Sequence, residues 1–108
     1  MHSPPSILQR WVSLPSLEFQ RDDCAAVTLS GDRVIVLGGR YRKSGEILDL
    51  SMWKDGTLPD TFKWSALPKN MKCKRAGFAA VSLEDDRVVV VGGNDGREHL
   101  ATAEVGDA

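Results

Sequence analysis

Two segments of this 108-residue chain have nearly the same sequence: residues 33–39 read Arg-Val-Ile-Val-Leu-Gly-Gly and residues 87–93 read Arg-Val-Val-Val-Val-Gly-Gly. Four successive apolar and mostly β-branched residues predict a short strand that is buried on both faces. The glycine pair indicates positions where only a residue without Cβ fits, through a positive φ or a close backbone neighbour. The residues expected to be buried are Val34, Val36, Val88 and Val90, and Gly39 and Gly93 are expected to lie against neighbouring backbone.

The similarity extends well beyond these two strands. Residues 21–39 align with residues 75–93 without a gap, and 11 of the 19 positions are identical. Upstream, Trp11-Val-Ser-Leu-Pro recurs as Trp64-Ser-Ala-Leu-Pro. These two copies are 53 positions apart, whereas the aligned segments are 54 positions apart. An internal repeat of about 50 residues is the period of a four-stranded propeller blade. No stretch of useful length has helical periodicity, so the expected fold class is all-β.

Apolar segments separated by turn residues divide the chain into a tail and two repeats. Residues 1–10, which include Pro4 and Pro5, are expected to form an extended N-terminal tail. Residues 11–108 divide into a fourth-type strand at 11–15, a first blade at 21–68, and a second blade at 75–108 that lacks its fourth strand. Strands are expected at residues 11–14, 24–29, 33–37, 46–50, 62–66, 77–83, 87–91 and 101–105.

The order of these features resembles the kelch repeat. Each copy has a leading arginine, a strand of small residues, a turn, an apolar strand ending in Gly-Gly, a variable loop and a third strand, and Trp-x-x-Leu-Pro occurs twice. The resemblance covers nearly all of the chain after residue 10. It implies about two four-stranded antiparallel blades of an incomplete kelch-type β-propeller. The structural residues of the repeat would be Arg21, Gly38, Gly39, Trp11, Trp64, Gly92 and Gly93.

The third strands depart from the kelch pattern. Members of that family usually have a tyrosine just before an aspartate in this strand. Here Leu48 precedes Asp49 in one copy, and Gly106 precedes Asp107 in the other. These departures affect the assignment of strands at the blade edges and leave the repeat itself intact.

Two basic segments are expected to meet at one end of the first blade. In a propeller blade the loop after the second strand and the connection to the next blade emerge on the same face. Here they are residues 40–45 and 68–76, which we call the basic rim. The rim holds seven cations in a chain of net charge −1, which makes a patch suited to an acidic or phosphorylated peptide. The seven are Arg40, Arg42, Lys43, Lys69, Lys72, Lys74 and Arg75. The candidate binding residues, including two from the second-repeat loop, are Arg40, Tyr41, Arg42, Lys43, Lys72, Lys74, Arg75, Asn94 and Arg97.

Each of these assignments has a structural alternative. Lysine-rich loops are often simply solvated, so the rim can be a surface without a partner. Arg21 and Arg75 can instead brace the start of each blade through hydrogen bonds to carbonyl groups. The tryptophans are expected to pack within the blades and not to serve as platforms for a ligand.

By its resemblance the chain would be a protein–protein interaction scaffold. The alternatives are a fragment of a sugar-directed kelch enzyme, either an oxidase or a mutarotase or epimerase, and a structural blade pair that assembles into a ring. A copper site needs several imidazole and phenolate ligands, and only His2, His99 and Tyr41 are present. The acidic pairs at 22–23 and 85–86 lie in connections or turns, where aspartate bonds to nearby backbone. We therefore expect no cofactor, no metal and no catalytic residue.

Composition and the chain ends bear on partners and location. A net charge of −1 gives no global attraction to nucleic acid or to an anionic membrane. The N-terminus has no signal-peptide pattern and no apolar run approaches a membrane span, so we expect a cytoplasmic protein with Cys24 and Cys73 as free thiols. Two blades alone leave faces open. The chain is therefore expected to be part of a longer propeller, or to form a homo-oligomer in which the strand at Trp11 completes the last blade of the next copy.

Overall fold

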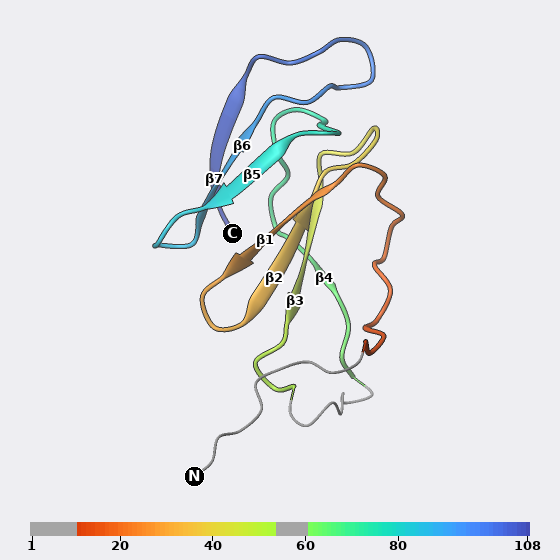
Figure 1. Cartoon of the computed structure of the whole chain (residues 1–108), viewed down its shortest axis with the longest axis vertical. Helices are drawn as coiled ribbons and strands as arrows, with labels where there is room; N and C mark the ends of the chain where they lie inside the picture. Colours follow the sequence, from red (N-terminus) through yellow and green to blue (C-terminus); the bar gives the residue numbers. More distant parts are fainter. Residues whose placement is uncertain (1–10, 54–60) are drawn as a thin grey trace.

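The computed structural model describes residues 11–53 and 61–108, which form seven β-strands and no helix. The first antiparallel sheet has four strands in chain order, namely β1 (Ala25–Leu29), β2 (Arg33–Leu37), β3 (Gly45–Asp49) and β4 (Ser65–Ala66). The second antiparallel sheet has three, namely β5 (Ala79–Ser82), β6 (Arg87–Val91) and β7 (Ala103–Asp107) (Figure 1). The prediction of an all-β fold is confirmed. The described residues contain no helix that is long and apolar enough to cross a membrane.

The two sheets pair their strands in the same register. Val36 of β2 faces Glu46 of β3, and Val90 of β6 faces Glu104 of β7. The pairing of β1 with β2 recurs in β5 and β6 at the offset of the sequence repeat, with Ala26 opposite Val36 in one sheet and Ala80 opposite Val90 in the other. The third strands are offset further, because the loop after β6 is longer than the loop after β2. The sequence repeat is therefore a repeat of three paired strands.

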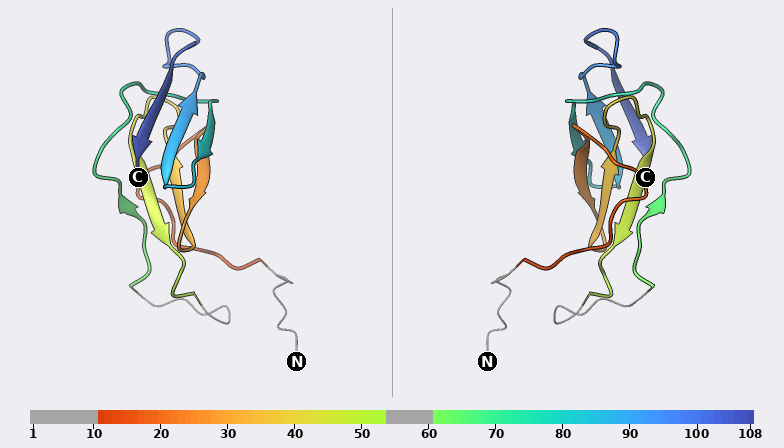
Figure 2. Two further views of the ribbon diagram at one scale, coloured as in Figure 1. Left: turned by 90° about the vertical axis from the view of Figure 1, so that its left-hand side faces the viewer. Right: turned by 90° about the vertical axis from the view of Figure 1, so that its right-hand side faces the viewer.

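One core joins the two sheets, which pack face to face (Figure 2). Leu29, Ile35 and Leu37 of the first sheet pack with Val88 and Val90 of the second, and all five are buried. Strands β1 and β5 are in contact, so the first strand of each repeat lies beside its counterpart (Figure 1). Burying an aliphatic side chain of this size contributes about 1.5–3 kcal/mol, and this core is the main attraction between the sheets.

A polar contact joins the two β-hairpins. Arg33 Nη2 donates to Asp86 Oδ2 at 2.9 Å, and Asp86 also accepts hydrogen bonds from the backbone nitrogen and the hydroxyl of Ser30. The hydrogen bonds from Ser30 hold the pKa of Asp86 below its ordinary value. Asp86 has φ of +64°, in the left-handed region that aspartate tolerates in turns. Asp86 thus both forms part of the turn between β5 and β6 and links the second sheet to Ser30 and Arg33 of the first.

The central strands have the predicted bounds, and the outer ones differ. The strands at 33–37 and 87–91 have the predicted bounds, with Val36, Val88 and Val90 buried and Val34 half-buried. The prediction of burial on both faces is wrong for residues 87–91, because Val91 on the other face is 47% exposed. The strand expected at 62–66 shrinks to the two residues of β4. The strand expected at 101–105 is instead β7, two residues later. The predicted tail at 1–10 lies outside the described residues.

Residues 11–15 do not form the strand that their sequence predicts. Residues 11–17 have no strand, and the Trp11 side chain is 95% exposed. The outer edge of β3 is already paired with β4, so this first Trp-x-x-Leu-Pro segment finds no free strand there. Its Pro15 carbonyl instead accepts a hydrogen bond of 2.9 Å from Nε1 of the half-buried Trp64.

Candidate functional site

The two segments of the basic rim lie side by side, as the sequence predicts. The Met71 backbone nitrogen donates to the Lys43 carbonyl at 2.9 Å, and the Arg75 nitrogen donates to the Arg42 carbonyl at 3.2 Å. Backbone hydrogen bonds therefore hold the connection between the sheets against the loop after β2. The cations of both segments gather at one end of the molecule because of this pairing.

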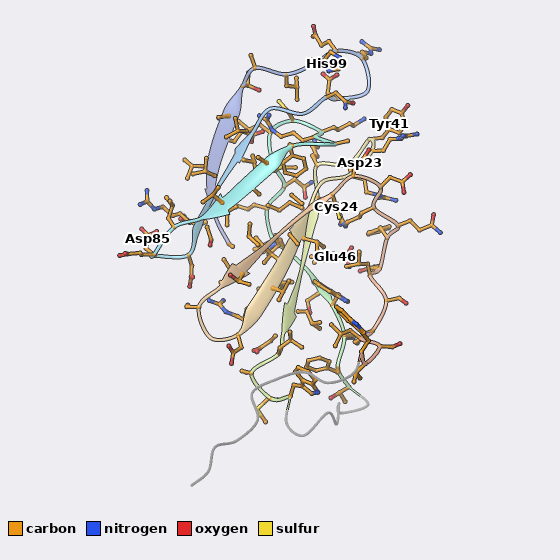
Figure 3. All side chains as sticks on the ribbon, in the orientation of Figure 1. Asp23, Cys24, Tyr41, Glu46, Asp85 and His99 are labelled. Atoms are coloured by element: carbon orange, nitrogen blue, oxygen red, sulfur yellow. The ribbon has the colours of Figure 1, made fainter. Side chains whose placement is uncertain are left out.

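The loop after β6 joins the same end through Tyr41 and Gly96. The Tyr41 ring lies so close to Gly96 that a Cβ added to this glycine would stand 2.6 Å from a ring carbon. Figure 3 shows Tyr41 and His99 at the same end of the molecule, away from Asp85. Tyr41 has φ of +64° and remains 63% exposed. A left-handed backbone is uncommon for a bulky residue, and it turns this aromatic ring outward between the two repeats.

The Asn94 side chain is occupied within its own loop. Its Oδ1 accepts a hydrogen bond from the Gly96 nitrogen at 3.2 Å, and its backbone exchanges hydrogen bonds of 2.9 and 3.0 Å with Ala76. These contacts anchor the 92–102 loop to the connection that precedes β5. Arg97 is exposed at the tip of the loop. Of these two candidate residues, Asn94 anchors the 92–102 loop to the connection, and Arg97 is accessible at the tip of this loop.

The arginines next to Tyr41 line a shallow pocket. The Arg42 guanidinium lies 4.7 Å from the centroid of the Phe19 ring, and its Nε donates to the Gln20 carbonyl at 2.9 Å. Arg40 is exposed and its backbone nitrogen donates to the Asp22 carbonyl. The pocket has a volume of about 170 Å³, and its lining residues are Gln20, Asp22, Arg40, Tyr41 and Arg42. A preordered guanidinium, an aromatic ring and a second arginine thus surround one opening.

The lysines of the rim point into solvent. Lys43, Lys69, Lys72 and Lys74 are all exposed. The described residues include no ion pair of any of these lysines with an acidic side chain. Their positive charge is therefore available to an incoming anionic group.

Arg75 does not belong to the exposed rim. Its side chain is fully buried and its guanidinium donates to the carbonyls of Gly92 and Thr102, each at 2.9 Å. It also donates to the Thr102 hydroxyl and pairs with Glu104 at 3.1 Å. The expectation that Arg75 contacts a partner is corrected by this burial. The alternative role, bracing the start of the repeat, accounts for all of these contacts.

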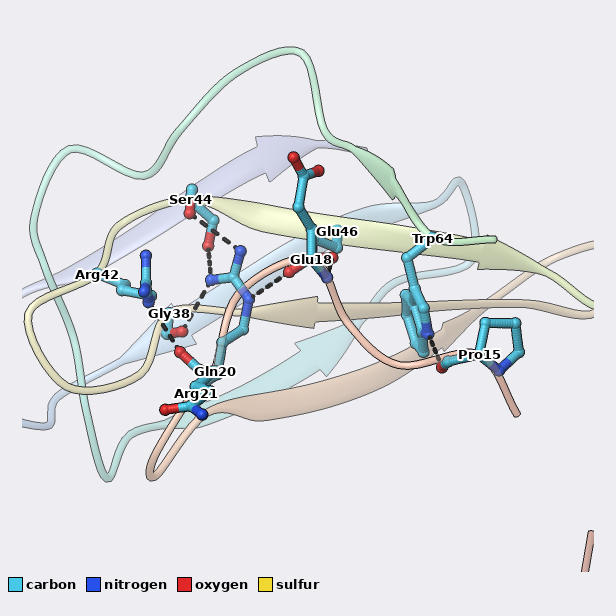
Figure 4. Close-up of polar contacts among 9 residues, drawn as sticks. All are labelled: Pro15, Glu18, Gln20, Arg21, Gly38, Arg42, Ser44, Glu46 and Trp64. Carbon is cyan, nitrogen blue, oxygen red and sulfur yellow. Dashed lines mark hydrogen bonds and ion pairs between the residues drawn. The ribbon is translucent and has the colours of Figure 1, made fainter. Parts of the chain in front are cut away.

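Arg21 makes the same set of contacts one repeat earlier (Figure 4). Its guanidinium donates to the carbonyls of Gly38 and Ser44 at 3.0 and 2.9 Å, and to the Ser44 hydroxyl at 3.0 Å. Its Nε pairs with Glu46 at 2.9 Å. The remaining Glu46 oxygen accepts a hydrogen bond from the Glu18 backbone nitrogen, as Glu104 does from Lys72. Each repeat is therefore closed by one buried arginine and one glutamate.

The acidic partners of these arginines were not among the residues predicted from the sequence. Ser44 and Glu46 in the first repeat correspond to Thr102 and Glu104 in the second, so a hydroxyl-x-Glu pattern occurs twice. Its two copies lie further apart than the aligned segments do, because the second loop is longer. An ungapped alignment ends before reaching it. Allowing one insertion after the glycine pair brings both glutamates into register.

The pKa of Glu104 is set by opposing effects. Partial burial alone would raise the pKa of this carboxyl group. Hydrogen bonds from the Lys72 nitrogen, the Arg75 guanidinium and the Cys73 nitrogen outweigh it and hold the pKa below its ordinary value of 4.5. Glu104 is therefore stabilised as a carboxylate in the folded protein.

Other chemically capable residues have structural roles or stand apart. Asp85 pairs with Arg87 at 2.7 Å, and hydrogen bonds from Arg87 hold the pKa of Asp85 below its ordinary value. Cys24 and Cys73 are both half-buried free thiols. Within residues 11–53 and 61–108, no three His, Cys, Asp or Glu side chains gather as a metal site would require.

Comparison with known proteins shows a partial similarity to a dynein chain. No family model matches this chain. In an alignment of 69 residues that covers 61% of the chain, it is 36% identical to the dynein alpha chain of the flagellar outer arm from Chlamydomonas reinhardtii. The chain spans about 2% of the length of that protein. The similarity is thus to a short segment of a very large polypeptide.

Proposed function

We propose that this chain is a protein-interaction module of the kelch type, whose basic rim binds an acidic or phosphorylated peptide. The observation that carries the proposal is the backbone pairing of Met71 with Lys43 and of Arg75 with Arg42. This pairing holds two loops and their exposed cations together at one end. A rigid scaffold that presents loops in this way is a common arrangement for binding.

Several features support the assignment of the two sheets as neighbouring propeller blades. Both sheets have the same strand register, their first strands β1 and β5 lie side by side, and each is braced by an arginine–glutamate pair. Blades of a propeller are antiparallel sheets arranged radially with their first strands innermost, which agrees with these contacts.

The residues around Tyr41 favour a peptide with negative charge as the ligand. Tyrosine and arginine are over-represented among the residues that dominate binding energy. Arg40 and Tyr41 are exposed, while the Arg42 guanidinium is held over Phe19 and loses less freedom on binding. The lysines add long-range attraction that is screened over about 8–10 Å at physiological salt.

The similarity to a dynein chain supports the view that such a module can be part of a larger polypeptide. The two free thiols, Cys24 and Cys73, agree with a reducing compartment, and we propose a cytoplasmic location on this basis.

The test uses three fluorescein-labelled decapeptides: alternating Glu and Ser, the same sequence with phosphoserine, and a neutral version with Gln in place of Glu. We expect anisotropy to show binding of the two acidic peptides and not of the neutral one. The double variant Arg40→Glu/Lys72→Glu should weaken binding by at least about tenfold, because a hydrogen bond to a charged group contributes about 1.5–3 kcal/mol. Raising the salt concentration should weaken binding as well.

Lys63 provides a matched control. It is exposed and precedes β4, at the end of the first sheet opposite the rim. Lys72→Glu and Lys63→Glu make the same change in net charge, but only the former lies on the rim. Equal loss of binding in the two variants would mean that the peptide responds to net charge alone, and the rim would not be its site.

A further inference from the structure

The second sheet has one apolar face that is open to solvent. Side chains alternate between the two faces of a strand. Val88 and Val90 of β6 are buried against the first sheet, so β6 and its neighbours turn their other side chains outward. That open face carries Val81 at 57%, Val91 at 47% and Val105 at 59% exposure. Leu83 lies on the same side of the chain and is 36% exposed.

The same face of the first sheet is buried. By the repeat, Leu83 corresponds to Leu29, Val91 to Leu37 and Val105 to Ile47. Leu29 and Leu37 are only 6% and 8% exposed because the second sheet covers them. The open face therefore has the composition of a surface that, one repeat earlier, is covered by another sheet.

The outer edge of β7 is open as well. In the first sheet the corresponding edge of β3 pairs with β4, where Ser65 faces Ile47, and the Leu67 nitrogen donates to the Gly45 carbonyl. Within the described residues, β7 has a strand neighbour only in β6. An unpaired edge strand next to an apolar face is a template for another strand.

We propose that these two surfaces bind a second copy of this chain, which contributes its segment 11–15 as a fourth strand beside β7. The segment Trp11-Val-Ser-Leu-Pro matches the sequence around β4, yet in the single chain Trp11 is 95% exposed and Leu14 is 42% exposed. The first sheet of the second copy then covers Val81, Val91 and Val105, as the second sheet covers the first within one chain.

The residues that follow segment 11–15 are already arranged for this contact. The Glu18 nitrogen donates to Glu46 in the same way as the Lys72 nitrogen donates to Glu104, so both connections approach their sheets alike. The described hydrogen bond that residues 11–17 would lose on leaving their own chain is the one between Trp64 Nε1 and the Pro15 carbonyl.

One of the two polar contacts between the hairpins has a counterpart of matching charge at the proposed contact. Within one chain Arg33 pairs with Asp86 across the sheets. Their repeat counterparts are Arg87 and Asp32, so Arg87 of one copy would meet Asp32 of the next. Glu84 stands where Ser30 does, so Asp32 would face a carboxylate in place of the hydroxyl that donates to Asp86, and this position opposes the contact.

The contact is head-to-tail, because the surface that donates the segment differs from the surface that receives it. A contact of this kind closes into a ring when the rotation allows. At two sheets per chain, two to four copies would give the roughly four to eight blades of closed propellers. This inference concerns the lateral face of the second sheet, and it is independent of the peptide site proposed for the rim.

The experiment compares four versions of the 108-residue chain by light scattering and sedimentation over a wide range of concentration. The unmodified chain should form a discrete oligomer. Val105→Glu removes the receiving surface and Trp11→Ser removes the donated segment, so each variant alone should have the mass of a single chain. Met52→Glu changes an exposed apolar residue elsewhere, 68% exposed, and should assemble like the unmodified chain.

Mixing the two defective variants tests the direction of the contact. A Val105→Glu chain can still donate its segment to a Trp11→Ser chain, so an equimolar mixture should form dimers and nothing larger. Circular dichroism should show that both variants stay folded, because both side chains are exposed in the single chain. The proposal is overturned if the unmodified chain stays single at every concentration. It is also overturned if Trp11→Ser assembles normally, or if the mixture does not pair.

Discussion

Arg21 and Arg75 each hold together two strands and a connection through the same kinds of acceptor. Both side chains are fully buried, and each guanidinium meets two carbonyl groups, a hydroxyl group and a glutamate. A buried charge is tolerated when it is paired and its donors are satisfied, and removing one partner then costs about 3–5 kcal/mol. At the residue scale these pairs fix where each repeat begins.

The pH dependence of stability tests the pair in the second repeat. The pKa of Glu104 is lowered in the folded state, so its carboxylate stabilises the fold above the unfolded pKa of 4.5. This contribution is lost as the pH falls through the lower, folded-state pKa. Glu104→Gln should therefore be less stable at neutral pH, and its stability should fall less between about pH 6 and pH 3. Thermal melts across this range measure both effects. Glu98→Gln, at an exposed carboxylate, is the control, and equal pH profiles for all three proteins would contradict the prediction.

At the scale of the element, the glycine pair at the end of β6 combines two different requirements. Gly92 and Gly93 have φ of +73° and +89°, which L-residues rarely adopt. A Cβ on Gly93 would stand 2.6 Å from the Ala76 carbonyl oxygen and 2.8 Å from the Phe78 Cβ. A Cβ on Gly92 would have no neighbour closer than the Leu100 oxygen at 3.7 Å. The two neighbouring glycines thus share the conformational requirement and differ in crowding.

Alanine at each position separates these effects. Gly92→Ala should lose about 1–2 kcal/mol through its left-handed backbone. Gly93→Ala should lose about 1–3 kcal/mol more, because the added methyl group overpacks the contact with Ala76. Urea denaturation gives the free energy of unfolding of each variant. Equal losses would mean that the close approach at Gly93 carries no energetic weight.

At the scale of the whole molecule, stability and association are coupled by the open face of the second sheet. If copies associate through this face, only folded chains take part in the association, so the Tm should rise with protein concentration. Val105→Glu should give a Tm that is independent of concentration, whereas Met52→Glu should keep the dependence. Calorimetry on dilution series of the three proteins provides the measurement. A constant Tm for the unmodified chain would indicate that its open face has no partner among its own copies.

The sequence by itself determined the strands and their repetition. The β-branched runs at 33–37 and 87–91, bounded by turns and glycines, specify strands through local residue chemistry. The ungapped repeat of residues 21–39 at 75–93 then specifies that the first two strands of both sheets pair alike. The joining of the rim segments was predicted from the blade layout that the kelch resemblance implies, in which the loop after the second strand and the connection to the next blade emerge on the same face.

Whether a residue is buried or a segment is paired depended instead on which other parts of the folded chain lie beside it. Arg75 looked like one more cation of a basic loop, but Glu104, far along the chain, supplies the partner that allows it to be buried. Trp11 and Trp64 begin matching segments, yet only the segment at Trp64 reaches a free strand edge, because β3 has room for one partner. Matching valines and leucines are likewise buried in one sheet and exposed in the other. Local sequence specifies how a segment prefers to fold, whereas burial and pairing also require a complementary surface, and only the tertiary structure determines where one is present.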